Sequence, residues 1–302
     1  MLYEDLVDIL SEISGTKVIT NELMNRHTSF RVGGPCSLFI SPDKNHLPDI
    51  IAFCKKIALP YVVIGRGSNI LVSDNGFEGL VIEIGDVFNK ITVSVDMITA
   101  ESGASLASVA RAAYENSLTG LEFASGIPGS CGGGLYMNAG AYGGEMKDVI
   151  YSARALDSDG KELEFTPDDM DLSYRHSAFM EKNLIITEMV FKLKAGNKDE
   201  IKATMDDYNG RRRDKQPLNY PSAGSFFKRP EGNFAGKLIE DAGLAGLRVG
   251  GAKVSAKHCG FVINVDNATS KDIINLMKKV QAEVNDKFGI MLEPEVRMLG
   301  KF

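Results

Sequence analysis

The stretch SGIPGSCGGGLYMNAGAYGG, residues 125–144, holds eight of the chain's 31 glycines. A run this rich in glycine predicts an ordered loop rather than a helix or strand, and ordering such a loop costs much conformational entropy. Small and apolar residues within it, such as Ile127 and Ala139, argue against a solvated linker. We therefore expect a pyrophosphate or a flat ring system to approach this backbone closely, with a flexible surface loop as the alternative.

A second glycine turn, Gly65-Arg66-Gly67-Ser68-Asn69, follows the buried-strand run Tyr61–Ile64. The Rossmann pattern requires a third glycine at position 70 and a helix after it, but the chain continues Ile70-Leu71-Val72. A P-loop is excluded as well, because residues 232–237 are one residue short and Leu238 stands where Ser or Thr is required. Successive backbone N–H groups in the turn would suit phosphate oxygens. Alternatively, the turn needs glycine only for a positive φ.

The composition of the 302-residue chain is that of a globular protein, and its length predicts two or three domains. No apolar run approaches the ~18–20 residues that span a bilayer, and the N-terminus lacks a basic signal region, so we expect a cytoplasmic protein with no membrane partner. The four cysteines and four histidines are dispersed, which predicts buried thiols and no bound metal. The net charge of −6 argues against nucleic acid as a partner, but allows a small anionic ligand held by local arginines and lysines.

Hydrophobic periodicity predicts helices and strands along the whole chain, in three units with boundaries at 1–85, 86–196 and 197–302. Helices are expected at about 3–13, 47–57, 105–116 and 199–209, the last ending at Asn209-Gly210. Thr269–Asp272 forms a capping box that opens one more helix. Strands are expected at 37–40, 61–64, 70–72, 80–84, 91–95, 98–100, 152–156, 162–165, 184–193, 261–265 and 290–299.

The predicted strand 290–299 alternates in polarity. Its apolar face would carry Ile290, Leu292, Val296 and Met298. Its polar face would carry Glu293, Glu295 and Arg297. Glu295 and Arg297 would then lie about 7 Å apart along one side of the strand, close enough to share a polar cleft. A solvated outer face is the alternative.

Two short patterns of penicillin-recognising enzymes also occur in the chain. Ser225-Phe226-Phe227-Lys228 matches S-x-x-K, and Ser73-Asp74-Asn75 matches S-D-N. The order of the two is reversed, however, and no K-T-G follows them. We interpret both as chance matches.

Six motifs occur in the order found in the UDP-N-acetylenolpyruvoylglucosamine reductase family, which the chain resembles over essentially its whole length. They are Ser29–Gly34, Gly65–Leu71, Ser125–Gly144, Tyr174–Ser177, Ala223–Lys228 and Glu295–Arg297. The resemblance implies an α+β fold, in which residues 1–85 and 86–196 form a two-subdomain FAD-binding module of vanillyl-alcohol-oxidase (PCMH) type. Residues 197–302 would then form an α+β substrate-binding domain. Another FAD-dependent oxidoreductase of the same superfamily is the alternative, but it would lack the Ser225 and Glu295 motifs.

The resemblance implies that NADPH, through FAD, reduces the enolpyruvyl ether of UDP-N-acetylglucosamine to UDP-N-acetylmuramate, a cytoplasmic step of peptidoglycan synthesis. The expected partner is therefore a small nucleotide sugar. Arg175, Ser225 and Glu295 would form the catalytic group. A guanidinium suits the enolate-like charge that hydride addition leaves near the substrate carboxylate, and a hydroxyl can deliver the quenching proton. Glu295 would act either protonated or as a polarising partner.

The same resemblance assigns binding residues. For the cofactor they are Val32, Gly33, Gly34, Gly65, Arg66, Gly67, Ser68, Asn69, Ile70, Ser125, Gly126, Ile127, Pro128, Gly129, Ser130, Gly133, Asn138, Ala139, Gly140 and Arg212. For the substrate they are Tyr174, Lys215 and Arg229. Few residues separate Phe191-Lys192-Leu193 from the next predicted helix, so the chain resembles the shorter branch of the family, which lacks a tyrosine-bearing lid.

Overall fold

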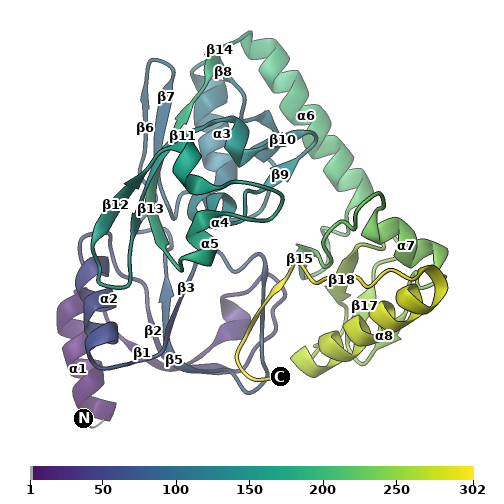
Figure 1. Cartoon of the computed structure of the whole chain (residues 1–302), viewed down its shortest axis with the longest axis horizontal. Helices are drawn as coiled ribbons and strands as arrows, with labels where there is room; N and C mark the ends of the chain where they lie inside the picture. The colour runs from purple at the N-terminus through teal and green to yellow at the C-terminus, as the bar shows by residue number, and fades with distance from the viewer. Residues whose placement is uncertain (1–2) are drawn as a thin grey trace. The chain divides into compact units, whose positions relative to one another are not determined.

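The computed structural model describes residues 3–302, whose helices and strands are drawn in Figure 1. The described residues divide into two compact units, each assembled from separate segments of the chain. Unit 1 consists of the segment that ends at Thr20, of Leu38–Arg66 and of Gly79–Arg211. Unit 2 consists of Asn21–Ser37, Gly67–Glu78 and Arg212–Phe302. Each unit therefore builds its core from residues that are distant in sequence.

A five-stranded antiparallel sheet of order β12-β11-β13-β7-β6 lies in unit 1. Its strands are β6 (Ile91–Ser94), β7 (Met97–Glu101), β11 (Ile150–Leu156), β12 (Glu162–Phe165) and β13 (Ile185–Lys192). Helix α3 (Leu106–Glu115) follows β7 and begins at Ser105, whose side chain accepts from the Ser108 N–H at 3.0 Å. The apolar positions of α3 are buried, as the periodicity predicted. The predicted helix at 105–116 and the strands of this sheet are confirmed.

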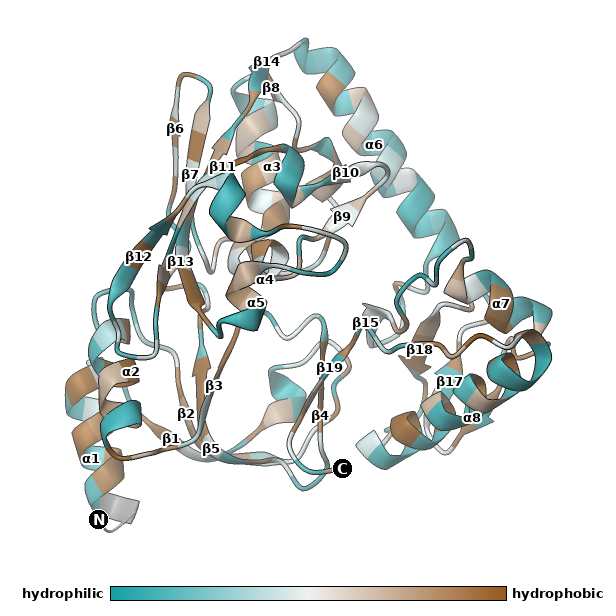
Figure 2. Ribbon diagram, viewed as in Figure 1, coloured by the Kyte–Doolittle hydropathy of each residue, from teal (hydrophilic) through white to brown (hydrophobic). Residues whose placement is uncertain are grey.

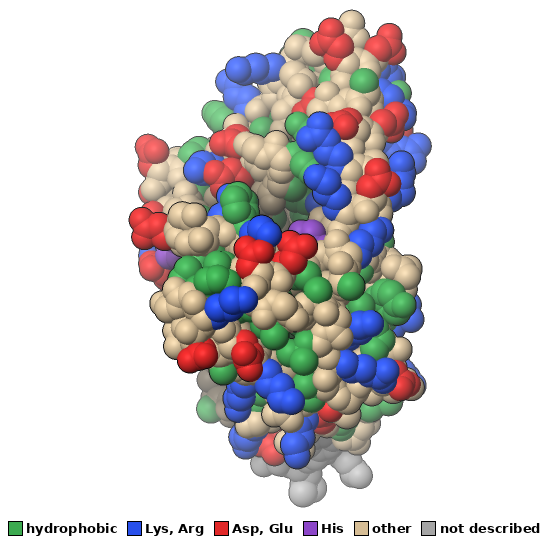
Figure 3. All heavy atoms as spheres, turned by 90° about the vertical axis from the view of Figure 1, so that its right-hand side faces the viewer, with side chains coloured by type: hydrophobic (Ala, Val, Ile, Leu, Met, Phe, Trp, Pro, Cys, Tyr) green, Lys and Arg blue, Asp and Glu red, His purple; other side chains and the backbone are tan. Residues whose placement is uncertain are grey.

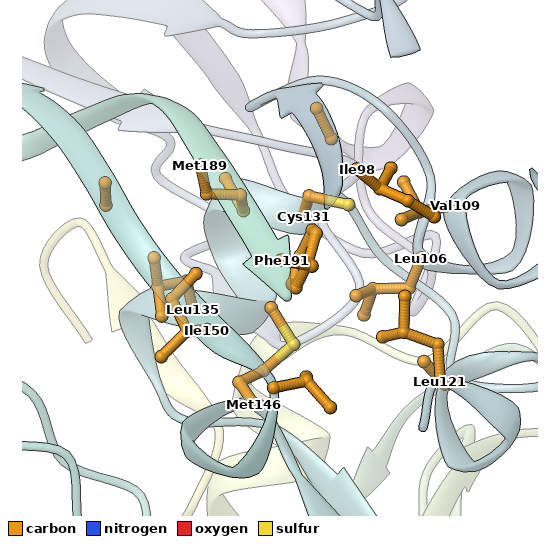
Figure 4. Packing of buried hydrophobic residues seen from close by; sticks show 14 of the residues in the cluster. Ile98, Leu106, Val109, Leu121, Cys131, Leu135, Met146, Ile150, Met189 and Phe191 are labelled. Atoms are coloured by element: carbon orange, nitrogen blue, oxygen red, sulfur yellow. The ribbon is translucent and has the colours of Figure 1, made fainter. Parts of the chain in front are cut away.

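Residues 125–144 contain a helix, α4 (Cys131–Tyr136), so the prediction that this stretch holds no regular element is wrong. Ser130 caps the helix, and a Cβ on Gly132 would lie 2.2 Å from the Ser102 Oγ. Glycine costs a helix about 1 kcal/mol relative to alanine. Here it allows α4 to pack tightly, and in Figure 4 Cys131 lies beside Phe191 of β13 in the buried cluster.

Helices α1 (Tyr3–Ser14) and α2 (Leu47–Lys56) contact each other in unit 1 and bury one apolar face each. Strand β3 (Tyr61–Ile64) runs parallel to β5 (Phe77–Glu83), within a sheet of order β1-β2-β5-β3 that includes β1 (Ile19–Leu23) and β2 (Pro35–Ile40). The remaining short elements of unit 1 are β8 (Leu118–Thr119), β9 (Gly140–Ala141), β10 (Gly144–Glu145), α5 (Ala178–Glu181) and β14 (Lys194–Ala195).

A four-stranded antiparallel sheet of order β15-β18-β17-β16 lies in unit 2. Its strands are β15 (Ser222–Ser225), β16 (Arg248–Val249), β17 (Ala252–Val254) and β18 (Phe261–Asn264). Helices α7 (Ala235–Asp241) and α8 (Ser270–Phe288) share a buried cluster with it. The predicted capping box of α8 is confirmed, because Thr269 and Asp272 bond reciprocally and the helix ends at Gly289 with φ 68°.

Helix α6 (Lys198–Lys215) continues through Gly210, so the prediction that it ends at Asn209-Gly210 is wrong. Figure 2 shows that the helix is largely hydrophilic. Ion pairs one turn apart join Lys202 to Asp206 and, at 2.8 Å, Arg211 to Asp207. Such pairs contribute about 0.2–0.5 kcal/mol each, and acids in the first turn and bases in the last complement the helix dipole. Together these charges offset the cost of the glycine.

The predicted strand 290–299 is wrong in extent. Only β19 (Arg297–Leu299) is a strand, and it pairs in parallel with β4 (Ile70–Val72). Pro294 makes an isolated bridge with Phe227, and a proline has no N–H to extend a ladder. Leu292 and Val296 are buried as the alternation predicted, but Met298 is 39% exposed, so the apolar face ends before it.

Candidate active site

Two glycine-rich segments meet inside unit 1, at Gly65 and Ser130. A Cβ on Gly65 would lie 2.2 Å from the Ser130 Oγ, so a larger residue there would require this hydroxyl to move. Ser130 is buried, and its hydroxyl accepts from the Gly133 N–H at 3.4 Å. The neighbouring Arg66 guanidinium is 2.8 Å from the carboxylate of Asp86. The fold thus brings together two segments that the sequence assigns to one cofactor.

The backbone of these segments is accessible on unit 1. The half-buried members of the predicted cofactor set are Gly65, Ser125, Gly126, Ile127, Gly129 and Gly140. Arg66, Pro128 and Gly133 are exposed, and Ser130, Asn138 and Ala139 are buried. Backbone without side chains leaves room for a phosphate or a flat ring to reach its N–H groups. The glycine backbone packs closely on the protein at Ser130 and is accessible elsewhere, which fits a dinucleotide such as FAD.

In unit 2, close contacts with neighbouring backbone explain why glycine is needed at two of the predicted cofactor positions. Gly67 has φ 59°, and a Cβ on it would lie 1.9 Å from the carbonyl oxygen of His27. A Cβ on Gly34 would lie 2.0 Å from the carbonyl oxygen of Asp74. The positive φ of Gly67 agrees with the alternative that the sequence left open for its turn, and close backbone packing accounts for Gly34. The half-buried members in this unit are Gly33, Gly34, Ser68, Asn69, Ile70 and Arg212, while Val32 and Gly67 are buried.

Tyr174 and Arg175 form the tip of a tight turn in unit 1. Ser173 and His176 close the turn with reciprocal backbone hydrogen bonds of 3.3 and 3.2 Å. Arg175 has φ 56°, a left-handed conformation that few side chains adopt. Its guanidinium lies 5.0 Å from the centre of the Tyr174 ring, within the range of a cation–π contact. The turn therefore holds an arginine in an uncommon and defined conformation.

Charged groups flank this turn. The Nε2 of His176 lies 3.1 Å from the carboxylate of Asp171 and 3.8 Å from that of Glu181. The candidate ligand atoms of all three residues lie within 4.8 Å of one another. Both acids are exposed, and exposed acids commonly lie together without an ion. We assign the cluster as polar contacts of His176 beside the turn and not as a metal site.

Ser225 and Glu295 lie on neighbouring segments of unit 2. The Glu295 N–H donates to the carbonyl oxygen of Phe226 at 2.8 Å, and the Lys228 N–H donates to that of Glu293 at 2.8 Å. Ser225 is exposed, whereas Phe226 is buried in the core of the unit. The fold therefore brings two of the three predicted catalytic residues to adjacent positions on one backbone frame.

Asn69 joins the predicted cofactor turn to this frame. Its Nδ2 donates to the carbonyl oxygen of Glu295 at 3.2 Å, and its own carbonyl accepts from the Arg297 N–H at 3.0 Å. The parallel pairing of β4 with β19 continues this contact. The segment that carries Glu295 is therefore bonded on both sides, to the Ser225 strand and to the turn that contains Asn69.

The predicted substrate cations in unit 2 are exposed. Lys215 ends α6, and the guanidinium of Arg229 lies 4.6 Å from the ring centre of Phe234. His258, which the sequence analysis did not single out, lies within the electrostatic reach of Lys215. Burial lowers the pKa of His258 below its ordinary value, and the charge of Lys215 lowers that pKa further. No motif surrounds this histidine in the sequence, so no signal pointed to it.

A surface groove of about 630 Å³ in unit 1 was also not predicted. Its lining residues are Tyr142, Ala203, Thr204, Asp207, Tyr208 and Arg211. The Tyr142 and Tyr208 rings stack with their centres 4.5 Å apart. The groove is open to solvent and borders the last glycines of residues 125–144. Tyr142 belongs to the sequence motif Ser125–Gly144, but the sequence did not show that α6 lies against this residue.

Charge is mixed on the face drawn in Figure 3, where Lys and Arg side chains lie among Asp and Glu side chains. A phosphate-bearing ligand on this face would therefore depend on local contacts rather than on a broad basic field. None of the helices in the described part of the chain has the length and apolar character needed to cross a membrane.

Comparisons with known proteins agree with this site. A family model described as "UDP-N-acetylenolpyruvoylglucosamine reductase, C-terminal domain" matches residues 216–299, and one described as "FAD binding domain" matches residues 38–166. The chain is 51% identical to the UDP-N-acetylenolpyruvoylglucosamine reductase of Agathobacter rectalis, over 94% of this chain and 95% of that one. The crystal structure of the reductase from Thermus caldophilus covers 94% of this chain and 98% of its own, with 32% identity and a TM-score of 0.80.

A further structural likeness concerns the fold alone. An alkyldihydroxyacetonephosphate synthase matches 65% of this chain and 41% of its own, with 16% identity and a TM-score of 0.50. The predicted α+β fold class is confirmed, with an FAD-binding domain followed by a C-terminal domain of the reductase family. The chain is an FAD-dependent oxidoreductase, and it belongs to the UDP-N-acetylenolpyruvoylglucosamine reductase family.

Proposed function

We propose that the protein catalyses the NADPH-dependent reduction of UDP-N-acetylglucosamine enolpyruvate to UDP-N-acetylmuramate, in the cytoplasmic synthesis of peptidoglycan precursors. The observation that carries this proposal is the backbone link of 2.8 Å between Glu295 and Phe226, which keeps Glu295 beside the Ser225 strand. This link lies in the domain that matches the reductase family model. It supports a paired role for Ser225 and Glu295 in proton delivery.

Each proposed catalytic residue has a distinct role. When bound, FAD would supply the hydride chemistry that links NADPH to the terminal vinyl carbon of the substrate. Arg175 binds the substrate carboxylate and stabilises the negative charge that develops beside it. Ser225 gives its hydroxyl proton to the adjacent carbon, which completes the lactyl group. Glu295 polarises or reprotonates that hydroxyl, since an unaided serine is a weak acid.

We further propose the binding roles and boundaries expected from the sequence. The accessible glycine backbone at Gly65 and at 125–130 would hold FAD, with Arg212 as a cationic contact. Tyr174, Lys215 and Arg229 would contact the nucleotide sugar, whose diphosphate suits exposed cations. The two FAD subdomains would span 1–85 and 86–196, and the substrate domain would span 197–302.

The purified protein provides the first test. We expect it to carry FAD and to oxidise NADPH in proportion to added UDP-N-acetylglucosamine enolpyruvate, one mole for one mole. A flavin-containing protein that oxidises NADPH at the same rate with and without this substrate would support another oxidoreductase of the superfamily instead. A colourless protein that takes up no FAD would contradict both functions.

A further inference from the structure

The turn that carries Arg175 needs support from outside itself. Arg175 has φ 56°, which is unfavourable for a residue with a side chain. Two backbone bonds between Ser173 and His176 close the turn. A residue in such a conformation persists when the surrounding structure holds it, and such residues gather at functional sites. The groups that hold this turn are therefore of functional interest.

Two side-chain bonds hold the ends of the turn onto α4 and the residues after it. The Nδ2 of Asn138 donates to the carbonyl oxygen of Ser173 at 3.0 Å. The hydroxyl of Ser177 donates to the carbonyl oxygen of Tyr136 at 2.6 Å. One bond thus lies just before Tyr174 and the other just after His176. Together they attach the arginine turn to the glycine-rich segment.

Burial and hydrogen bonds fix the side chain of Asn138 in its position. Asn138 is fully buried, with an exposed fraction of 0% and φ 45°. Besides Ser173, its Nδ2 donates to the Glu145 carboxylate at 2.8 Å, and its Oδ1 accepts from the Lys147 N–H at 3.0 Å. Both amide protons are therefore used within unit 1. The side chain is a rigid junction between the arginine turn and the turn that follows β10.

We propose that Asn138 is a positioning residue, whose buried amide holds the Tyr174–Arg175 turn so that the Arg175 guanidinium can meet the substrate carboxylate. This inference rests on the proposed function, because it takes Arg175 as the group that stabilises the substrate's developing charge. Asn138 itself does not touch the substrate in this account. A small displacement of Arg175 is sufficient to slow the reaction, since electrostatic stabilisation depends on fixed geometry.

A pair of substitutions isolates the bond to Ser173. Asn138→Asp keeps the shape of the side chain and still accepts from Lys147, but it loses both donors. Adding Glu145→Gln supplies an amide donor that can bond to the carboxylate introduced at position 138, which restores the contact between positions 138 and 145. The bond to the Ser173 carbonyl is then the one that stays broken. Glu145→Gln alone is the matched control, because its amide oxygen can still accept from Asn138. FAD content and thermal midpoint are measured first for all three proteins, and Asn138→Ser serves if the double variant does not fold.

The decisive readout is the reoxidation of bound FAD by UDP-N-acetylglucosamine enolpyruvate, followed by rapid mixing, beside the reduction of FAD by NADPH. We expect reoxidation to slow about 10- to 100-fold in Asn138→Asp/Glu145→Gln, with NADPH reduction and FAD content close to wild type. Glu145→Gln should stay within about 2-fold of wild type. Loss of FAD, or equal slowing of both steps, would overturn the positioning role.

A double-mutant cycle with Arg175→Ala separates this inference from the proposed function. If Asn138 acts through Arg175, its substitution should cause no further slowing once Arg175 is alanine. If the two losses multiply instead, Asn138 acts elsewhere and the inference fails. If Arg175→Ala alone leaves reoxidation unchanged, the assigned role of Arg175 fails, and the proposed function is then what must be revised.

Discussion

The turn that carries Arg175 in unit 1 and the paired segments that carry Ser225 and Glu295 in unit 2 are held by different kinds of bond. In unit 1, the side chains of Asn138 and Ser177 hold the turn. In unit 2, backbone N–H groups hold the Glu295 segment against the Ser225 strand. Side-chain bonds can be removed by one substitution, whereas backbone bonds survive it.

This difference predicts where the protein tolerates mutation. Substitutions around Arg175 should alter its placement, even when they lie outside the turn. Substitutions around Ser225 and Glu295 should leave the frame in place and change only the chemistry of the replaced side chain. Ser225→Ala and Asn69→Ala below test this contrast, together with the cycle on Asn138. Gly65→Ala and Asp272→Asn test the cofactor turn and the start of α8.

Ser225→Ala should give the largest effect, because it removes the proposed proton donor and leaves every backbone bond of its strand intact. We expect reoxidation of bound FAD by the enolpyruvyl substrate to slow about 10²- to 10⁴-fold, the usual contribution of a positioned acid. Reduction of FAD by NADPH should be unchanged. Rapid mixing of each half-reaction measures both. Wild-type turnover in this variant would show that Ser225 is not the donor.

Gly65→Ala should weaken FAD binding in unit 1, because its Cβ would lie 2.2 Å from the Ser130 Oγ. Overpacking of this kind costs about 1–3 kcal/mol, which corresponds to roughly 5- to 150-fold in affinity. Titration of the apoprotein with FAD measures it. Gly85→Ala is the control, since Gly85, like Gly65, has no left-handed φ, and a Cβ on it would meet nothing closer than 3.5 Å. If both variants bind FAD equally well, the close approach at Gly65 is unrelated to the cofactor.

Asn69→Ala removes the side-chain bond from the Asn69 Nδ2 to the carbonyl oxygen of Glu295, at 3.2 Å. Because the backbone link to Phe226 remains, we expect only about a 5-fold slower reoxidation step, equivalent to about 1 kcal/mol for one hydrogen bond. The loss should be clearly smaller than that of Asn138→Asp/Glu145→Gln in the same assay. A loss as large as that one would contradict the contrast between side-chain and backbone support.

Asp272→Asn should give the smallest effect, and only on stability. Partial burial would raise the pKa of Asp272, but N–H groups of Thr269 and Gly251 donate to its carboxylate, and its pKa lies below the ordinary value. A lowered pKa stabilises the fold above the unfolded value of about 3.9, and this stabilisation is lost as pH falls through the folded value. Because Asp272 is solvent-screened and Asn still accepts a bond, we expect less than about 1 kcal/mol at pH 7.

Urea unfolding of wild type and Asp272→Asn at pH 7 and at about pH 3 measures this prediction. The two proteins should differ in midpoint at pH 7 and converge at the lower pH. An equal difference at both pH values would mean that packing, and not the carboxylate charge, stabilises the start of α8.

The parts of the fold that were predicted correctly depend on neighbours in sequence. Ser105 caps α3 and Thr269 caps α8 through residues three positions away. The parts that were wrong depend on distant residues. Gly132 of helix α4 packs closely on Ser102, and β19 pairs with β4, which precedes it by more than two hundred residues. No local pattern contains that information.

The same division applies to the candidate site. The sequence motifs singled out Arg175, Ser225 and Glu295, but they did not show which hydrogen bonds hold these residues in place. Asn138 was assigned to the cofactor by its motif, yet its amide protons are used by Ser173 and Glu145. The bond to Ser173 joins residues 35 positions apart, so it could be found only in the folded chain.

The central claim is the identity of the reaction, and the most direct test is the product of a single turnover. The protein is reduced anaerobically with one equivalent of NADPH and then mixed with one equivalent of UDP-N-acetylglucosamine enolpyruvate. The account predicts UDP-N-acetylmuramate, heavier than the substrate by two hydrogens, as identified by mass spectrometry and by the lactyl methyl signal in NMR. Recovery of unchanged enolpyruvyl substrate from protein that remains reduced would contradict it.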